Sequence, residues 1–266
     1  MATLVSFHAH PDDESIACGG VMRRAHEDGH RVVLVVATRG ERGEVADDFL
    51  ADGEELWQRR VAETQAAAEV LGVSRVEFLG YVDSGMMGLP TNDEPGTFWT
   101  ADVEEAAEKL AAILREEDAD VLTVYDDHGG YGHPDHIQVH RVGIRAAELA
   151  GTPRVYQSTM NRDHIRRNLE ARLAEAEAAG EDAPEVPRVD VSTFGTPEAE
   201  ITAAVDVTAF VQHKRKAMRA HASQISESSF FLAMPDEAFA VAFGTEWFIR
   251  AGQGPGITET DLLAGL

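Results

Sequence analysis

The first 155 residues alternate between β-rich runs and helical patterns, and this alternation constrains the fold more than any other feature of the sequence. The β-rich runs lie at 3–8, 31–38, 75–79, 120–125 and 154–156. The helical patterns between them lie at 14–28, 54–72, 102–117 and 135–150. Such alternation is typical of a parallel sheet covered by helices on both faces. The almost entirely apolar second run suits a strand buried on both sides.

The remainder of the chain is less regular. Its predicted elements are a helix at 161–182, a Pro-containing link at 184–187, a helix at about 207–223 and a strand or buried segment at 239–249. The simplest account is one α/β domain over 1–266, with a core at 1–157 and a C-terminal elaboration at 158–266. We expect a Rossmann-like, mostly parallel sheet with the strand order 3-2-1-4-5.

Composition excludes several classes of protein. Acidic residues number 47 against 23 basic ones, which gives a formal net charge of −24. Because phosphate binding needs a basic surface, nucleic acid is not an expected partner, and an anionic membrane is disfavoured for the same reason. The single cysteine, Cys18, excludes an intramolecular disulfide and a Cys-based zinc cluster. Without a secretory signal or a long apolar run, we expect a soluble cytoplasmic protein, with a homo-oligomer as one alternative for its assembly.

Residue types that bind metals follow the first predicted strand. Ligands of an open parallel sheet bind beyond the carboxyl ends of its strands. A dinucleotide-binding protein carries GxGxxG there, whereas this chain has HAHPDDE, which disfavours an NAD site. His10, Asp12 and Asp13 offer imidazole and carboxylate, and a catalytic zinc takes three such groups and leaves one position for water. The alternative, an acidic helix N-cap, accounts for only one of the two carboxylates.

A second polar cluster, YDDHGGYGHPDH, follows the fourth predicted strand at 125–136. Its glycines permit backbone conformations that are closed to other residues, and Pro134 suits the first turn of a helix. His133 and His136 are three residues apart and can share one helical face. Because strands 1 and 4 are neighbours in the expected order, we expect the two clusters to meet over one cleft.

Together, HAHPDDES and GGYGHPDHI resemble the motifs of the LmbE-like/PIG-L family of zinc-dependent N-acetylglucosaminyl deacetylases. Within this family the sequence is most similar to the branch of mycothiol deacetylases and mycothiol-conjugate amidases. The resemblance extends from about residue 4 to 157, with a weaker match in KRKAMRAHASQ at 214–224. It implies a metal-dependent amide hydrolase that acts on a small N-acyl amino sugar, such as GlcNAc-inositol or a mycothiol-type compound.

The resemblance also implies a set of metal ligands, drawn from both motifs, and a general base. It implies that His10, Asp13 and His136 hold a Zn²⁺ ion and that Asp12 is the general base. Iron(II) suits the same set of histidine and aspartate ligands and is the alternative metal.

Five further roles follow from the resemblance. His133 would act as general acid or electrostatic stabiliser, Tyr131 would reach the oxyanion, and Asp135 would orient a histidine. Arg60 and Asp83 match positions that contact the polyol part of the substrate. These assignments have structural alternatives: a helix cap for His133, packing for Tyr131, and for Arg60 an ion pair with the glutamate three residues later.

Two other functions remain as alternatives. One is a deacetylase of another amino sugar or of an antibiotic intermediate, distinguished by the residues that shape the pocket at 84–100 and 157–206. The other is a non-catalytic, Rossmann-like sugar-binding module. The presence of Asp12 beside an apparently complete set of metal ligands argues against the second alternative.

Overall fold

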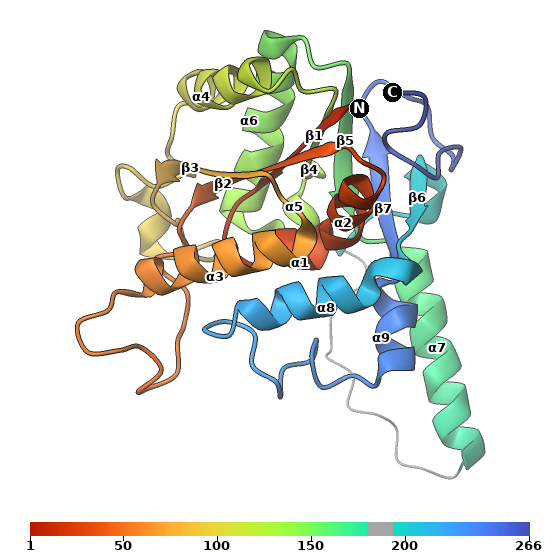
Figure 1. The fold of residues 1–266 in the computed structure, drawn as a ribbon. Coiled ribbons are helices and arrows are strands. Elements are labelled where there is room, and N and C mark those ends of the chain that lie inside the picture. Colours follow the sequence, from red (N-terminus) through yellow and green to blue (C-terminus); the bar gives the residue numbers. More distant parts are fainter. Residues whose placement is uncertain (180–193) are drawn as a thin grey trace.

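The computed structural model describes residues 1–179 and 194–266, and its centre is a sheet with the strand order β3-β2-β1-β4-β5-β7-β6 (Figure 1). β1 to β5 pair in parallel, whereas β7 runs antiparallel to both β5 and β6. The strands are β1 (Thr3–His8), β2 (Arg31–Thr38), β3 (Arg75–Tyr81), β4 (Val121–Tyr125), β5 (Arg154–Thr159), β6 (Ala203–Asp206) and β7 (Thr245–Arg250). The predicted order 3-2-1-4-5 is confirmed, and the C-terminal part adds two strands at one edge.

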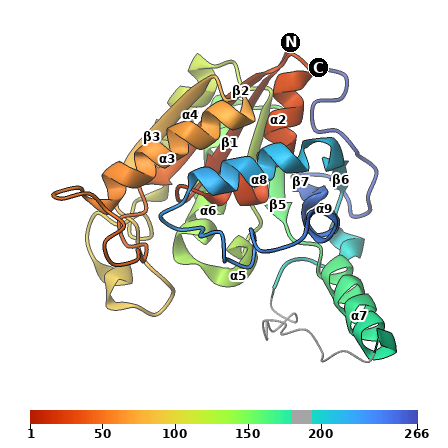
Figure 2. The same ribbon diagram turned by 60° about the horizontal axis from the view of Figure 1, so that its bottom comes forward.

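Helices cover both faces of the sheet. The α-helices are α1 (Asp13–Ala17), α2 (Gly19–Glu27), α3 (Leu56–Leu71), α4 (Val103–Glu116), α5 (Gly129–Gly132), α6 (Pro134–Ala150), α7 (Arg162–Ala179), α8 (Val211–Ala220) and α9 (Asp236–Phe243). Short 3₁₀ helices lie at Pro90–Asp93, Glu198–Glu200 and Thr208–Phe210. α2, α3 and α8 pack on one face, and α4 and α6 on the other (Figures 1 and 2).

Alternation along the central strands separates two apolar layers. Val32 and Leu34 of β2 belong to the buried cluster on the α2 and α3 side, whereas Val33 and Val35 belong to the cluster on the α4 and α6 side. Because successive side chains of a strand point to opposite faces, a strand covered on both sides needs apolar residues at every position. This requirement explains the unbroken apolar run at 31–38.

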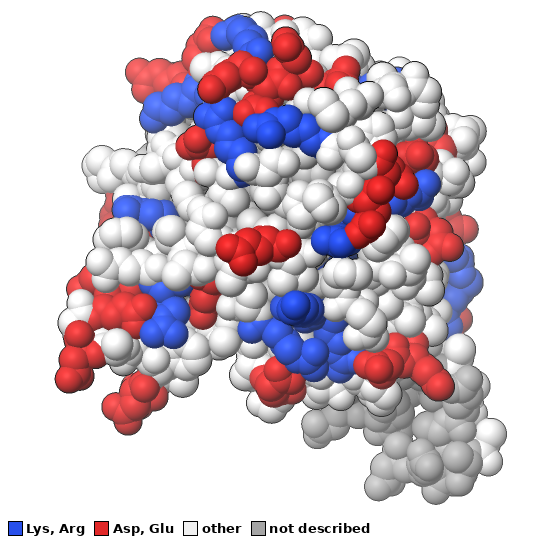
Figure 3. All heavy atoms as spheres, viewed as in Figure 1, with Lys and Arg blue, Asp and Glu red and all other residues white. Residues whose placement is uncertain are grey.

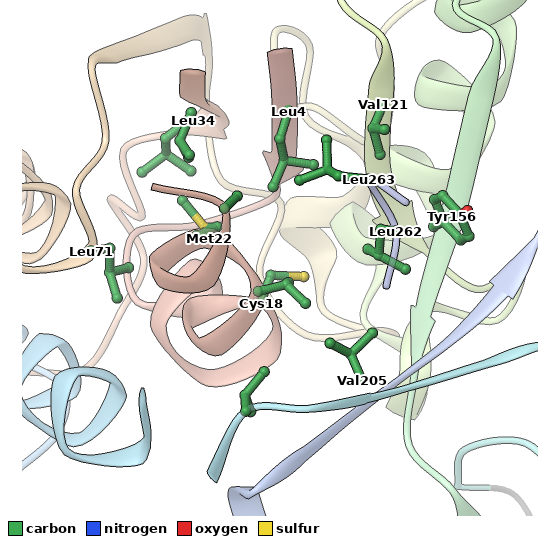
Figure 4. Packing of buried hydrophobic residues seen from close by; sticks show 14 of the residues in the cluster. Leu4, Cys18, Met22, Leu34, Leu71, Val121, Tyr156, Val205, Leu262 and Leu263 are labelled. Atoms are coloured by element: carbon green, nitrogen blue, oxygen red, sulfur yellow. The ribbon is translucent and has the colours of Figure 1, made fainter. Parts of the chain in front are cut away.

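Figure 4 shows the first of these layers from close by. Leu4 of β1, Met22 of α2 and Leu71 of α3 belong to this layer, and all three are fully buried. Leu262 and Leu263, near the C-terminus, pack into the same cluster. The last residues of the chain therefore complete a core that the first residues begin.

Local signals set the ends of the two helices that border the site. α3 begins with a capping box between Glu55 and Gln58 and ends at Gly72, which has a φ of 77°. α6 has Pro134 in its first turn and ends at Gly151, whose φ is 73°. Both helices were predicted from the sequence, and their observed bounds differ from the expected ones by no more than two residues.

The prediction of one continuous helix at 14–28 was wrong. The chain forms two short helices, α1 and α2, that meet at Cys18, where the backbone has a φ of −129°. The backbone N–H groups of Gly20 and Val21 donate to the carboxylate of Glu246 at 2.7 and 2.8 Å. α2 thus has its own capped N-terminus, and the cap comes from a strand 226 residues further along the chain.

Two C-terminal predictions also need correction. The helix expected at 207–223 consists of a 3₁₀ turn and then α8, which already ends at Ala220. The segment 239–249 is neither one strand nor one buried run, because α9 ends at Phe243 and β7 begins at Thr245. Short apolar runs suit a helix and a strand equally well, and tertiary packing decides between them.

The remaining C-terminal predictions are only partly covered. The helix expected at 161–182 is observed as α7 up to Ala179, and 180–182 and the link at 184–187 lie outside the described residues. The single-domain interpretation over 1–266 stays a prediction. It is favoured by the fact that β6 and β7 belong to the same sheet as the N-terminal strands.

Charged side chains lie next to partners of opposite sign over much of the surface. On the face shown in Figure 3, basic side chains stand beside acidic ones. Arg31 and Arg75 both donate to Glu117, at 3.1 and 2.8 Å. Among the described residues, no helix combines the length and the apolar composition needed to cross a bilayer.

The buried ion pair between Lys214 and Glu246 generates a stability prediction. Lys214 Nζ lies 2.5 Å from Glu246 Oε1, and each side chain is only 2% exposed. We expect Lys214→Met to lower the free energy of unfolding by about 3–5 kcal/mol, because it leaves a buried carboxylate without its cation. Chemical denaturation measures this change.

The control is Lys216→Met on the exposed face of the same helix, with an expected change in the free energy of unfolding within about 0.5 kcal/mol. Equal losses in the two variants would contradict the interpretation.

Candidate active site

The two polar clusters meet at the carboxyl ends of β1 and β4. These strands pair in parallel, with Ser6 opposite Thr123, so the loops that follow them leave the sheet side by side. Asp13 lies between two histidines: its Oδ2 is 3.3 Å from Nδ1 of His10, and its Oδ1 is 3.3 Å from Nε2 of His136. This arrangement confirms the expectation that the two clusters meet.

The donor set fits a divalent metal ion. Ring nitrogens of His10, His133 and His136 lie within 4.8 Å of one another, and all three side chains are buried. Burial disfavours a charge on His10, but Asp83, Asp13 and Asp135 outweigh it and raise the pKa of this histidine well above its ordinary value. The surroundings therefore favour a positive charge at this position. The imidazoles of His10 and His136 and the carboxylate of Asp13 between them are ligand types that zinc and iron(II) both accept.

Asp12 occupies a strained backbone conformation beside this set. Its φ is 98°, in a region that costs a non-glycine residue on the order of 1–3 kcal/mol. It stands at the N-cap position of α1, yet its side chain makes no capping hydrogen bond. Burial raises the pKa of Asp12 to about 6, against the opposing effect of Arg60. The capping alternative is therefore not realised, and the carboxylate has the elevated pKa that suits a general base.

Asp135 connects the two loops through hydrogen bonds. It is fully buried, and its Oδ2 lies 3.1 Å from His10 Nε2. The same carboxylate accepts the backbone N–H of Ser84 at 2.9 Å and the Ser84 hydroxyl. Since Nε2 of His10 faces Asp135, its Nδ1 faces Asp13. The hydrogen bond between Asp135 and Nε2 holds the His10 ring in one orientation, as a carboxylate behind a metal ligand does.

His133 caps α6 and also faces the site. Its Nδ1 accepts the backbone N–H of Asp135 at 3.1 Å, so the structural alternative for this residue is realised. In a neutral ring, acceptance at Nδ1 places the proton on Nε2. Burial, together with the charges of His10 and His136, lowers the pKa of His133 to about 4. The geometry thus favours a neutral hydrogen-bond donor over a charged general acid.

Tyr131 lies in the glycine-rich loop, about half exposed. Its hydroxyl is 3.5 Å from Nε2 of His136, so the loop brings it to the side of that ring that faces Asp13. The loop approaches α6 closely at Gly129, where an added Cβ would come within 2.7 Å of His136 Cβ. Gly129 also has a φ of 67°. A side chain at this position would displace the loop that carries Tyr131.

Arg60 and Asp83, predicted to contact substrate, both lie beside the site and are buried. Arg60 donates to the backbone oxygens of Gly40 and Pro11, at 2.8 and 2.6 Å, and approaches Asp12 Oδ2 at 3.3 Å. Its suggested ion pair with Glu63 is not the arrangement observed, because the Glu63 carboxylate accepts hydrogen bonds from Ser223 instead. Arg60 therefore acts on Asp12, and its contact with a substrate polyol stays a prediction.

Asp83 is similarly engaged by the protein. It accepts the backbone N–H of Gly85 at 2.8 Å and lies 3.5 Å from His10 Nε2. Burial opposes its negative charge, but the charge of His10 and these hydrogen bonds hold the pKa of Asp83 well below its ordinary value. Asp83 is therefore a carboxylate that faces the site, and its contact with substrate hydroxyls also stays a prediction.

Sequence reasoning missed Tyr125, which supports His136. The two rings stack at 4.4 Å with an interplanar angle of 16°. The Tyr125 hydroxyl lies 2.8 Å from His8 Nδ1, and His8 Nε2 lies 2.7 Å from the Ser6 hydroxyl. His8 thus supports the site through Tyr125. The sequence feature that could have revealed this role is an aromatic residue at the last position of β4, which is also the first residue of the second cluster.

Comparisons with known proteins agree with this geometry. The model of a protein family described as PIG-L: GlcNAc-PI de-N-acetylase matches residues 5–147. A protein of Geodermatophilus obscurus named 1D-myo-inositol 2-acetamido-2-deoxy-alpha-D-glucopyranoside deacetylase is 41% identical, over 99% of this chain and 97% of the relative. A protein of the same name from Nocardiopsis dassonvillei is 44% identical, over 97% of this chain and 99% of the relative.

Among solved structures, the N,N'-diacetylchitobiose deacetylase of Pyrococcus horikoshii has a similar fold. Its TM-score is 0.57 at 22% identity, and the match covers 93% of this chain and 83% of that chain. At this identity the likeness concerns the fold alone. The family resemblance seen in the two sequence motifs is confirmed by the family model and by relatives above 40% identity over nearly the whole chain. This chain therefore belongs to the PIG-L family of GlcNAc-PI de-N-acetylases.

Proposed function

We propose that this chain is a metal-dependent hydrolase that removes the acetyl group from the amine of GlcNAc-inositol. The observation that carries this proposal is the position of Asp12, a partly buried carboxylate with a raised pKa, next in the chain to Asp13 of the His10, Asp13 and His136 donor set. The names of the relatives, which match over nearly their full length, support the choice of substrate.

Zinc is the metal that we propose, with iron(II) as the alternative. His10, Asp13 and His136 would hold it, because Asp13 lies between the two rings and each histidine turns a nitrogen toward it. When bound, the ion supplies Lewis acidity and lowers the pKa of a coordinated water to about 7. Asp135 keeps the His10 ring in place through the hydrogen bond on its far side.

The chain's own residues then have complementary tasks. Asp12 accepts the proton of the attacking water and afterwards passes it to the leaving amine, as its raised pKa permits. His133 donates from Nε2 to the developing oxyanion, and the Tyr131 hydroxyl is a second donor. Each such donor contributes roughly 3–4 kcal/mol to the stability of the transition state. The products are acetate and a free amino sugar.

Substrate selection is assigned to the residues that border Asp12 and His10. We propose that Asp83 accepts hydrogen bonds from hydroxyl groups of the substrate, because its carboxylate is buried, ionised and turned toward the site. Arg60 lies next to Asp12. Polyol recognition by these two residues fits a sugar that is linked to inositol.

The first test is acetate release from a substrate panel of GlcNAc-inositol, a mycothiol conjugate and GlcNAc. We expect the highest kcat/KM for GlcNAc-inositol and a 10²–10⁴-fold loss of kcat in Asp12→Asn, roughly the range attributed to a general base. The control is Asp127→Asn, whose side chain is 82% exposed on the second loop, with unchanged activity. Preference for another N-acyl sugar would support the alternative deacetylase, and no turnover of any would support the binding module.

Metal removal provides a second test. We expect dialysis against a chelator to abolish acetate release, and stoichiometric Zn²⁺ to restore it, because the side chains of His10, Asp13 and His136 alone supply no Lewis acid that lowers the pKa of a water molecule. Parallel reconstitution with Fe²⁺ under anaerobic conditions compares the two metals. Full activity of demonstrably metal-free protein would overturn the proposal.

A third test concerns the support of His10 by Asp135. We expect Asp135→Asn to weaken metal binding by about 10–100-fold, because the amide cannot reproduce every hydrogen bond that the carboxylate accepts. Competition with a chromophoric chelator measures the affinity, and Asp127→Asn again serves as the control. An unchanged metal affinity in folded Asp135→Asn protein would show that this carboxylate does not set the orientation of His10.

A further inference from the structure

The peptide group between Pro11 and Asp12 is held at both its N–H and its C=O by hydrogen bonds. The backbone N–H of Asp12 donates to Oε2 of Glu14 at 3.0 Å. The preceding carbonyl, that of Pro11, accepts from Arg60 at 2.6 Å. Because a φ of 98° is unfavourable for aspartate, the conformation persists only where surrounding contacts enforce it. Glu14 and Arg60 supply those contacts.

Glu14 itself depends on a distant residue. Its side chain is fully buried, and a buried carboxylate requires hydrogen-bond donors. Besides the N–H of Asp12, the donors are the Ser15 hydroxyl at 2.6 Å and His221 Nε2 at 2.6 Å. Ser15 is the next residue on the same helix and moves with Glu14. His221 is therefore the contact that fixes Glu14 relative to the rest of the protein.

His221 is well fixed in its turn. It follows α8, and α8 packs against both α1 and α3 (Figures 1 and 2). Two residues later, the backbone N–H and the hydroxyl of Ser223 donate to the carboxylate of Glu63 on α3, at 2.9 and 2.6 Å. The KRKAMRAHASQ segment, which has no place in the mechanism so far, thus brings a histidine from the C-terminal part of the chain to the first motif.

We propose that His221 is a positioning residue for Asp12 and acts through Glu14. Its Nε2–H holds the Glu14 carboxylate in place, and this carboxylate holds the peptide N–H of Asp12 in the strained conformation that directs the base toward the site. Loss of the donor frees Glu14 and allows the Asp12 backbone to relax. The inference rests on the proposed function, because it takes Asp12 to be the general base.

The chemistry of His221 allows a matched pair of variants. Within the described part of the chain, its Nδ1 is buried and has no hydrogen-bond partner, so Nε2 makes the contact that matters. The amide nitrogen of glutamine can take the place of Nε2, whereas that of asparagine lies near the position of Nδ1. His221→Gln therefore keeps a donor to Glu14, and His221→Asn keeps a polar side chain of similar character without that donor.

The test compares steady-state kinetics, metal content and melting temperature of the two variants, each as full-length metal-loaded protein. We expect His221→Asn to lower kcat by about 10–100-fold with little change in KM, since a small displacement of a catalytic group has effects of this order. His221→Gln should retain kcat within about 3-fold of wild type. Both variants should bind the metal stoichiometrically. Equal loss of kcat in the two variants, or no loss in His221→Asn, overturns the inference.

Two further variants separate positioning from general stability. Ser223→Ala removes the hydroxyl hydrogen bond to Glu63 but keeps the backbone N–H bond that anchors the segment, and it does not touch Glu14. We therefore expect it to lower the melting temperature and leave kcat unchanged. In an Asp12→Asn background, His221→Asn should cause no further loss of kcat, because its effect acts through Asp12. A full additional loss there contradicts the inference. Wild-type kcat in Asp12→Asn alone would instead refute the proposed function.

Discussion

The parallel pairing of β1 with β4 is the constraint on which the site depends. These strands are separated by more than 100 residues in sequence, yet they lie next to each other at the centre of the sheet. Since parallel neighbours end at the same edge, the loops after them must leave the sheet together. Asp13 at the start of α1 and His136 in the first turn of α6 thereby come within 3.3 Å.

Around this junction, buried polar groups form a layer of supports behind His10, His136 and the backbone of Asp12. Asp135 holds His10, and Tyr125 stacks on His136. Glu14 holds the backbone of Asp12. A buried carboxylate or imidazole without partners would be costly, so each support must itself be satisfied. This requirement extends the network from the first motif to His221 after α8, and it explains how a C-terminal segment can influence the site.

Much of the fold could be predicted because its information is local. The order of strands and helices follows from the hydrophobic periodicity of the first 155 residues, and the position of both motifs at strand ends follows from that order. The site residues could be proposed because imidazole and carboxylate recur at the ends of two strands that must be neighbours. The limits of this reasoning appear at Cys18, where a continuous helical pattern is broken by a cap that comes from Glu246.

The sequence by itself determined the class of sheet, its central strand order and the chemistry of the residues that meet above it. Only the tertiary structure decided how those residues are held. The strained φ of Asp12, held in part by Arg60, and the Glu14–His221 pair depend on hydrogen bonds between parts of the chain that have no common periodicity. Periodicity tells which face of an element is apolar, whereas the partner of a buried polar group is set by the three-dimensional packing of distant segments.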